Sequence, residues 1–257
     1  NWVPKELVVG LAAGTFISSI LLVVFGMWGI GLQGTVRSVL TVISGIASIA
    51  FLAAFGTMLN MHVAFSYTGK HQLARRIVWG ISEYAKIPDG GVGLDIGCGS
   101  GALTIYTAKK NPNAKMIGID VWDNRYKEYS KTLCEQNAEA EGIKNVEFAK
   151  GNAIKLDYPD ESFDYVTSNY CYHNITGKNK QELLLETLRV LKKGGTFAIH
   201  DLMSVVRYGD MKSFKKKLLD MGYEEVELID TAHGLFMSSK EAKNVALRGS
   251  TLLVGKK

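Results

Sequence analysis

The chain has 257 residues and a formal net charge of +5, and 47% of its residues are hydrophobic while 21% are charged. This composition excludes a disordered chain and a fibrous repeat. Basic and acidic residues alternate and the one basic run, at 215–217, is short, so we expect no nucleic-acid partner. The cysteines are odd in number and lack a Cys-x-x-Cys spacing, which argues against a disulfide framework and a zinc site and favours a reducing compartment. They are Cys98, Cys134 and Cys171.

The first quarter of the chain is apolar and nearly uncharged. Lys5, Glu6 and Arg37 are the only charged residues in 1–61. The uncharged runs on either side of Arg37 both exceed the roughly 20 residues that cross a bilayer as a helix. A cleavable signal peptide, the alternative, has a shorter apolar stretch of about 7–15 residues and no second span directly after it. We therefore expect a two-span transmembrane hairpin over residues 1–61, with helices at 7–30 and 38–60.

The charges that flank the hairpin indicate its orientation. Lys5 precedes the first span, and Lys70, Arg75 and Arg76 follow the second, whereas the turn between the spans carries only Arg37. Because basic residues collect on the cytoplasmic side, we expect the N-terminus and the rest of the chain on that side of the membrane. The sequence predicts an integral membrane protein with the bilayer as a partner, and a connecting segment at 62–90 that includes an amphipathic helix.

After this segment, short apolar runs alternate with amphipathic stretches of about a dozen residues. This alternation predicts an α/β fold, a Rossmann-like doubly wound sheet that is mostly parallel. The last two strands have no helical pattern between them, so we expect an antiparallel C-terminal edge in this seven-stranded sheet. Strands are expected at Val92–Ile96, 116–121, 146–149, 163–168, 196–200, 225–229 and 250–255, and helices at 72–86, 101–110, 123–141, 179–192 and 210–221.

A glycine-rich loop follows the first of these strands, in the sequence LDIGCGSG of residues 94–101. Its glycines permit a sharp turn and a close approach of a ligand to the backbone, but the spacing also satisfies the dinucleotide fingerprint. Three polar residues shift the balance away from a dinucleotide. Asp95 precedes the glycines, Asp120 ends the next strand where it suits two ribose hydroxyls, and Asn152 follows the third strand with an amide suited to an adenine edge.

These residues resemble the motifs of the class I S-adenosylmethionine-dependent methyltransferases. Residues 95–101 are similar to motif I of that family, and Asp120 matches its ribose-binding acid. Asn152 stands where many members have Asp, a departure that keeps a hydrogen-bonding group. The stretches PDESFDYV (159–166) and LRVLKKGG (188–195) are similar to the segments that lead into the family's fourth and fifth strands. The resemblance covers about residues 70–257, is strongest to small-molecule, quinone and lipid methyltransferases, and implies a methyltransferase domain at 91–257.

The resemblance also implies a cofactor and the residues that hold it. The cofactor is S-adenosylmethionine, which leaves as S-adenosylhomocysteine. Cys98 is expected to be a small residue of the loop rather than a nucleophile, because direct methyl transfer needs no covalent intermediate. The expected cofactor-binding residues are Asp95, Gly97, Cys98, Gly99, Gly101, Asp120, Val121, Trp122, Asn152, Ala153, Asn169 and Tyr170.

The acceptor is expected at the carboxyl ends of the fourth and fifth strands, where ligands bind in open α/β sheets. His173 is the first candidate for a general base, and Asp201 or His200 is the second, because an acidic acceptor must lose a proton. Substrate contacts are expected from Tyr172, and from Tyr67 and His71 in the segment that leaves the membrane.

Taken together, these features predict a membrane-anchored methyltransferase that acts on a lipophilic small molecule such as a lipid, quinone or thiol. Two membrane spans would serve little purpose for a freely soluble acceptor. A nicotinamide-dependent oxidoreductase on a similar sheet is one alternative, although the sequence shows no recognisable hydride-transfer constellation. A non-catalytic membrane scaffold with a cofactor-binding domain is the other alternative. In such a scaffold, sequence drift would be expected to alter the glycine-rich loop and Asp120 first, and both are intact here.

Overall fold

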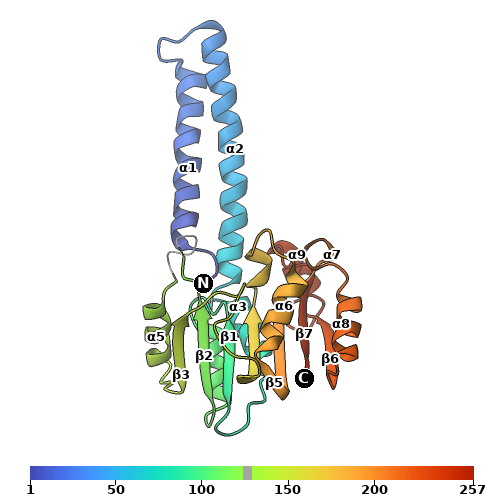
Figure 1. Ribbon diagram of the computed structural model, residues 1–257. Helices are drawn as coiled ribbons and strands as arrows, with labels where there is room; N and C mark the ends of the chain where they lie inside the picture. Colours follow the sequence, from blue (N-terminus) through green and yellow to red (C-terminus); the bar gives the residue numbers. More distant parts are fainter. Residues whose placement is uncertain (124–128) are drawn as a thin grey trace. The chain divides into compact units, whose positions relative to one another are not determined.

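The computed structural model describes residues 1–123 and 129–257 and divides the chain into two units, Asn1–Arg75 and Arg76–Lys257 (Figure 1). The first unit is a pair of long helices, and the second is an α/β domain with a single sheet. Each unit has its own internal packing and is described separately.

The N-terminal unit is a helical hairpin. Helix α1 (Lys5–Val23) continues into a π-helical turn, η1 (Val24–Trp28), and α2 (Gly34–Ala64) runs back. By length and composition, both helical stretches are long and apolar enough to cross a membrane, and most of their side chains face outward. The first helix ends a few residues earlier than the expected 7–30, and the second extends four residues beyond the expected 38–60.

Small residues and one arginine hold the two helices of the hairpin together. A Cβ on Gly14 would lie 2.7 Å from the ring of Phe51, so the glycine lets this ring pack against the α1 backbone. Ser48 donates a hydrogen bond to Ser18 across the pair, at 3.2 Å. At the turn, the Arg37 guanidinium donates to two carbonyls of η1, which have no partner in a regular helix end. The lone charge between the spans therefore caps the first helix.

The second unit contains a seven-stranded sheet in the order β3-β2-β1-β4-β5-β7-β6. The first five strands along the chain are parallel, and β7 is antiparallel to both of its neighbours. The predicted Rossmann-like sheet with an antiparallel C-terminal edge is confirmed. The strands are β1 (Val92–Ile96), β2 (Lys115–Asp120), β3 (Val146–Lys150), β4 (Phe163–Asn169), β5 (Leu191–Leu202), β6 (Glu225–Asp230) and β7 (Ser250–Lys256).

The helices of this unit lie where the periodicity predicts them, with several corrections. The helix expected at 72–86 spans only Leu73–Ser82. The helix expected at 179–192 ends at Arg189, because β5 already begins at Leu191. Of the helix expected at 123–141, residues 131–140 are helical, Ser130 caps it, and 124–128 lie outside the described residues. The stretch between β6 and β7 was expected to lack a helix and contains α9, whose single turn and capping box are too short to produce a periodic pattern. The helices are α3 (Leu73–Ser82), α4 (Ala102–Lys110), α5 (Lys131–Ala140), η3 (Tyr172–Asn174), α6 (Lys180–Arg189), α7 (Val205–Tyr208), α8 (Met211–Asp220) and α9 (Ser239–Asn244).

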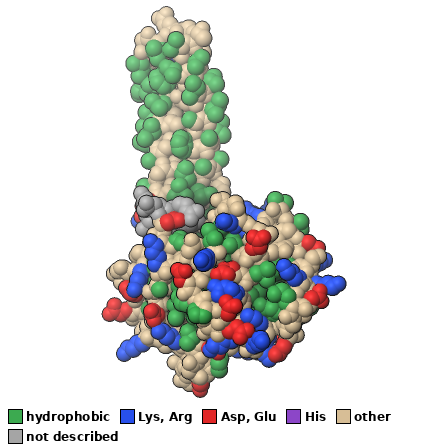
Figure 2. All heavy atoms as spheres, in the orientation of Figure 1, with side chains coloured by type: hydrophobic (Ala, Val, Ile, Leu, Met, Phe, Trp, Pro, Cys, Tyr) green, Lys and Arg blue, Asp and Glu red, His purple; other side chains and the backbone are tan. Residues whose placement is uncertain are grey.

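The apolar side chains of the α/β unit lie inside it. Leu94, Val166 and Ile199, on neighbouring parallel strands, are fully buried in one cluster together with residues of α6 and α8. Charged side chains are spread among tan and green ones over the visible surface of this unit, whereas the visible surface of the hairpin is almost entirely green and tan (Figure 2). The buried sheet gives the strand ends a fixed position, and those ends carry the candidate site.

Candidate active site

The predicted site residues converge on the carboxyl edge of the parallel strands. The strand order reverses between β1 and β4, because β2 and β3 continue to one side of β1 while β4 and β5 lie on the other. Ligands bind open α/β sheets at such a switch point. Asp95 lies in β1 beside the loop that follows it, Asp120 ends β2, Asn169 ends β4 and Asp201 lies next to the end of β5.

The loop after β1 is tightly constrained. The backbone amides of Gly97 and Cys98 both donate to the carbonyl of Ile119 in β2, at 2.8 and 3.0 Å. A Cβ on Gly97 would lie 2.3 Å from the Cys171 sulfur, so only glycine fits. Burial raises the pKa of the Cys98 thiol, which leaves it protonated and suits a packing role. Three glycines of the loop have positive φ, which lets the backbone present its face to a ligand: Gly97, Gly99 and Gly101.

Asp95 is fully buried beneath this loop. Its Oδ2 accepts a hydrogen bond of 2.6 Å from the Thr104 hydroxyl, while its Oδ1 has no partner among the described residues. Burial raises the pKa of Asp95 to about 7, and the nearby Asp120 carboxylate adds to the rise. A buried carboxylate oxygen without a partner is costly, so a cationic ligand at this point would be bound strongly. The ammonium of S-adenosylmethionine has the positive charge and the N–H donors that would partner this oxygen.

Asp120 organises the neighbouring backbone. Its Oδ2 accepts from the Gly99 amide and its Oδ1 from the Trp122 amide, both at 2.9 Å. The Trp122 indole donates back to the Gly99 carbonyl at 3.0 Å, and the residue has a φ of 41°, a strained value for a bulky side chain. Each carboxylate oxygen retains a second acceptor position, which suits the two hydroxyls of a ribose. Val121, between them, is half-buried at the same strand end.

The loop after β3 carries the expected adenine contacts. Asn152 accepts a hydrogen bond from the Ile154 amide at 2.9 Å through its side-chain oxygen, and its amide nitrogen remains as a donor for a base edge. Ala153 beside it is buried. Arg189, at the end of α6, holds the segment that runs from this loop toward β4.

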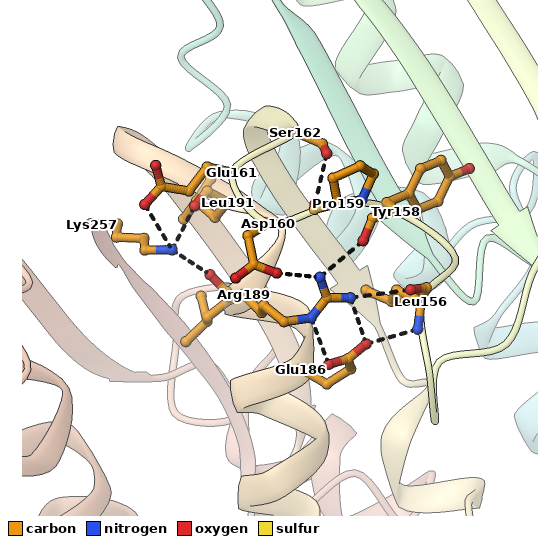
Figure 3. A network of polar contacts seen from close by, with 11 residues as sticks. Leu156, Tyr158, Pro159, Asp160, Glu161, Ser162, Glu186, Arg189, Leu191 and Lys257 are labelled. Atoms are coloured by element: carbon orange, nitrogen blue, oxygen red, sulfur yellow. Dashed lines mark hydrogen bonds and ion pairs between the residues drawn. The ribbon is translucent and has the colours of Figure 1, made fainter.

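Arg189 joins α6 to the loop that leads into β4 (Figure 3). Its guanidinium donates to both oxygens of Glu186 at 2.9 Å, and to the carbonyls of Leu156 and Tyr158 at 3.1 and 2.9 Å. A fifth contact of 2.6 Å reaches the Asp160 carboxylate. The hydrogen bond to Arg189 lowers the pKa of Glu186, so this pair stays charged at neutral pH. Only an arginine can make this many simultaneous contacts from one planar group.

A buried polar cluster supports the end of β4. His200 is fully buried, and its two ring nitrogens lie 2.8 Å from the Asn169 Oδ1 and the Thr231 Oγ1. Burial lowers the pKa of His200 to about 3, so the ring is neutral. Tyr170 packs against this ring at a centroid distance of 4.7 Å, has a φ of 51°, and shares a hydrogen bond of 2.7 Å with the Ser250 hydroxyl. Burial raises the pKa of Tyr170.

His173 and Asp201 form a pair at the same edge. The ring Nδ1 of His173 lies 2.6 Å from Oδ1 of Asp201, and the His173 amide donates to Oδ2 at 3.1 Å. Burial alone would raise the pKa of Asp201, but the hydrogen bond and charge of His173 hold it below its usual value. An ionised Asp201 accepts a hydrogen bond from Nδ1–H of His173, so Nε2 is the basic atom of the neutral ring. His173 is partly exposed while Asp201 is buried, so His173 is the member of the pair that a ligand can reach.

Two further groups of predicted residues lie elsewhere. Tyr172 is fully buried and shares a hydrogen bond of 2.5 Å with Thr187 of α6, so its side chain is directed into the core. Tyr67 and His71 belong to the N-terminal unit, and their expected contact with an acceptor stays a prediction. No group of three potential metal-ligating side chains occurs among residues 1–123 and 129–257.

Sequence reasoning did not identify three contributors to the site. Thr104 binds Asp95 from the first turn of α4, Thr231 orients His200 from the end of β6, and Phe236 packs edge-on against His200 at 5.5 Å. Thr104 follows the glycine loop at a fixed offset, so its hydroxyl offered a local signal. Thr231 and Phe236 are more than thirty residues from His200 along the chain and offered none.

The geometry corresponds to one class of protein. The sequence profile of a family described as "Methyltransferase domain" matches residues 87–244. The chain belongs to this family, and the resemblance to S-adenosylmethionine-dependent methyltransferases that the sequence indicated is confirmed. S-adenosylmethionine is the cofactor of that class, and the acidic and glycine-rich edge described above has the donors and acceptors that fit it.

Individual relatives narrow the comparison. A demethylmenaquinone methyltransferase of Geobacillus stearothermophilus is 34% identical over 124 residues, which are 47% of this chain and 50% of that protein. The protein of the same name from Lactobacillus johnsonii is 28% identical over 170 residues, 62% of this chain and 67% of that protein. The chain thus spans about half the length of the first of these curated relatives.

Solved structures show the fold. A geranyl diphosphate methyltransferase in complex with GPP and sinefungin aligns with a TM-score of 0.54 at 13% identity, over 74% of this chain and 79% of its own. The cyclase SpnF aligns with a TM-score of 0.53 at 19% identity, over 73% and 82%. Since a cyclase and a methyltransferase share this fold, the reaction has to be argued from the site.

Proposed function

We propose that the protein is a membrane-anchored enzyme that transfers a methyl group from S-adenosylmethionine to a lipophilic acceptor with an acidic proton. The observation that carries this proposal is the His173–Asp201 pair at the same sheet edge as an intact cofactor loop. A cofactor loop alone would suit a binding module. A base oriented by a buried carboxylate beside that loop suits catalysis.

The residues of the site divide the chemical work. S-adenosylmethionine, when bound, supplies an electrophilic methyl group on a cationic sulfur and leaves as the neutral thioether. Asp95 balances the charge of the cofactor's ammonium, and Asp120 holds its ribose. His173 accepts the acceptor's proton at Nε2, while Asp201 stabilises the imidazolium that results. His200 has both ring nitrogens engaged and a pKa of about 3, so we assign it the positioning of Asn169 rather than proton transfer.

The hairpin supports a lipophilic acceptor. Its two helices have the length and composition of membrane spans, and basic residues follow the second one at Lys70, Arg75 and Arg76. This distribution favours placement of the α/β unit on the cytoplasmic side. The name of the relatives, demethylmenaquinone methyltransferase, describes action on a prenylated quinone. A reduced quinone or a similar phenolic lipid has an acidic hydroxyl that suits His173.

The test uses the full chain in lipid nanodiscs with methyl-labelled S-adenosylmethionine. A total lipid extract and a soluble metabolite extract are offered in parallel, and we expect label in the lipid fraction. His173→Gln should lower kcat by about 10²–10⁴-fold and leave the cofactor Kd unchanged, as expected for loss of a general base. His233→Gln is the matched control, because His233 is an exposed histidine that is paired with Asp230.

Three outcomes would contradict the proposal in different ways. Label only in the soluble extract would leave the methyltransferase and remove the lipophilic acceptor. Cofactor binding without any turnover would favour the non-catalytic scaffold. Fluorescence transfer from the protein to bound NADH, without binding of S-adenosylmethionine, would favour the nicotinamide-dependent oxidoreductase.

A further inference from the structure

An exposed apolar patch lies directly beside the candidate site. The chain leaves β5 after Asp201 and forms the single-turn helix α7, in which Val205 is 75% exposed and Val206 is 97% exposed. Among the large hydrophobic side chains that the structure describes, Val206 is the most exposed. Apolar surface of this kind is unfavourable in water, and a pair of adjacent valines at a functional edge indicates a contact surface.

The turn that carries these valines is well fixed. Tyr208, at the other end of α7, is buried, and its carbonyl accepts a hydrogen bond of 2.9 Å from Gln181 of α6. The amides of Arg207 and Tyr208 both donate to the Ser204 carbonyl, which closes the turn. The valines are therefore held outward by buried contacts on the opposite side. Arg207 next to them adds a positive charge suited to an anionic lipid surface.

We propose that Val205 and Val206 insert into the lipid–water interface and turn the carboxyl edge of the sheet toward the bilayer, an inference that rests on the membrane anchoring proposed above. The chain itself supports this choice of partner. Helix α2 ends at Ala64 and the α/β unit begins at Arg76, and the eleven residues between them span at most about 40 Å. A unit tethered at this distance meets the membrane surface at high effective concentration.

The patch lies close along the chain to the His173–Asp201 pair, so a membrane contact there would affect how the acceptor reaches the site. Val205 follows Asp201 by four residues, so at most about 14 Å of extended chain separates the interface from the His173–Asp201 pair. Side chains at the interface lie about 5–10 Å deep, at the boundary of headgroups and acyl chains. A lipophilic acceptor would then reach the base from the bilayer without crossing bulk water.

The chain offers a matched control at the opposite edge of the sheet. Leu219 is 41% exposed and Met221 is 56% exposed, at the C-terminal end of α8. Helix α8 leads from the carboxyl end of β5 to the amino end of β6, and these strands are parallel because both are antiparallel to β7. Leu219 and Met221 are thus comparable exposed hydrophobic residues on the side that the proposal turns away from the membrane.

The experiment measures the depth of single labels in the full chain. Val206→Cys and Met221→Cys proteins are labelled with a small thiol-reactive fluorophore and incorporated into nanodiscs that contain anionic phospholipid and nitroxide-labelled lipid. The unsubstituted chain gives the background from its own cysteines. Interfacial depth predicts that the label at 206 loses about half of its emission, and the label at 221 less than about a tenth.

A second measurement links the contact to turnover. The probes are a naphthoquinol with a long isoprenoid tail, carried in the disc, and the same ring without the tail. Val205→Ser/Val206→Ser should raise KM for the tailed probe about fivefold, as expected for a weakened interfacial contact, and leave KM for the tailless probe and the cofactor Kd unchanged. Leu219→Ser/Met221→Ser should change neither KM.

The possible failures are distinguishable. Absence of quenching at both positions, or equal quenching at both, would overturn the inference, and intact methyl transfer in the same samples would leave the proposed function standing. Shielding of the label at 206 in lipid-free detergent at high protein concentration would assign the valines to a second copy of the chain and overturn the inference as well. Failure of the chain to remain in the discs would instead contradict the anchoring in the proposed function.

Discussion

The two units of the chain place their apolar side chains in opposite directions. In the hairpin, Ser18 and Ser44 are buried between the helices, while large apolar residues such as Phe16 and Ile46 face outward. In the α/β unit, the apolar residues form the interior and the charged ones cover the surface. Because each arrangement is stable only in its own solvent, the difference supports the proposal that one chain is built for two environments.

The largest effect on stability is expected from a charge in the centre of the sheet. Leu94 lies in β1 and is fully buried, so Leu94→Lys would place an unpaired ammonium among apolar side chains. We expect a loss of more than about 4 kcal/mol, enough to unfold the α/β unit, while the hairpin stays in the membrane. Loss of the thermal transition and of cofactor binding, with membrane association retained, would show this. Leu94→Ile is the control, and a variant that still melts near the parent temperature would contradict the prediction.

A charge on the outward surface of the hairpin tests whether that surface faces lipid or water. Ile49 lies near the middle of α2 and is 72% exposed, so Ile49→Arg would be nearly neutral if this surface faced water. In a spanning helix, an arginine at the centre costs about 2.5–3.5 kcal/mol of insertion free energy. We expect less alkali-resistant protein in the membrane fraction, and an unchanged fraction for Ile49→Leu. Equal integration of both variants would argue against a transmembrane hairpin.

A smaller loss of unfolding free energy is expected at the surface of the α/β unit, where Arg189 makes polar rather than apolar contacts. Arg189→Met would leave the carbonyls of Leu156 and Tyr158 without this donor, and Glu186 with only the Leu156 amide as a hydrogen-bond partner among the described residues. About 2 kcal/mol of unfolding free energy should be lost, and denaturant titration measures it. The pKa of Glu186 is lowered in the folded state, so its contribution is present near neutral pH and disappears as the pH falls.

Arg189→Lys provides the control for this network, because it keeps the charge and loses the planar fork. It should retain only part of the stability. If the methionine variant unfolded at the same denaturant concentration as the parent, the network in Figure 3 would contribute nothing measurable to the free energy of unfolding.

Local patterns made most of the fold predictable. Short apolar runs mark the buried parallel strands, and the long uncharged runs mark the hairpin helices. The features that could not be predicted depend on register between distant strands. Asn169 of β4 pairs with His200 of β5, and this register brings His173 and Asp201 together across 28 residues. The sequence ranked His173 first and Asp201 or His200 second as candidate bases, but it could not show that His200 is enclosed and neutral while His173 is partly exposed.

Backbone strain at the site was equally invisible in the sequence. Trp122 and Tyr170 each follow a strand end with a left-handed φ, and both face the carboxyl edge that carries the candidate cofactor residues. An aromatic residue gives no local signal for this conformation, which arises because Asp120 and the His200 cluster fix the neighbouring backbone. Strain of this kind commonly persists at functional sites, where the surrounding structure over-determines it.

The smallest predicted effect concerns Asp95, a fully buried carboxyl group whose Oδ1 has no partner among the described residues. Burial raises the pKa of Asp95 from 3.8 to about 7, so the folded protein without cofactor holds a proton there that the unfolded chain has already released. The free energy of unfolding of the cofactor-free protein therefore falls as the pH rises from about 4 to 7. An ammonium ligand reverses this preference, because it requires the ionised carboxylate. Cofactor affinity should fall about tenfold per unit below pH 7, or about 1.4 kcal/mol, with proton release on binding.

Calorimetry of S-adenosylmethionine binding in two buffers of different ionisation enthalpy measures that proton directly. Asp95→Asn keeps the size and hydrogen bonding of the side chain and removes its titration, so it should abolish both the proton release and the steep loss of affinity below pH 7. Parallel pH dependence in the parent and in Asp95→Asn would contradict the prediction, because the titrating group would then not be Asp95. The cofactor's own amine does not account for a loss of affinity below pH 7, since its pKa lies near 8 and it is already protonated there. The buried carboxyl group of Asp95 would then be a structural support of the loop, held by the Thr104 hydroxyl, rather than a partner of the ligand.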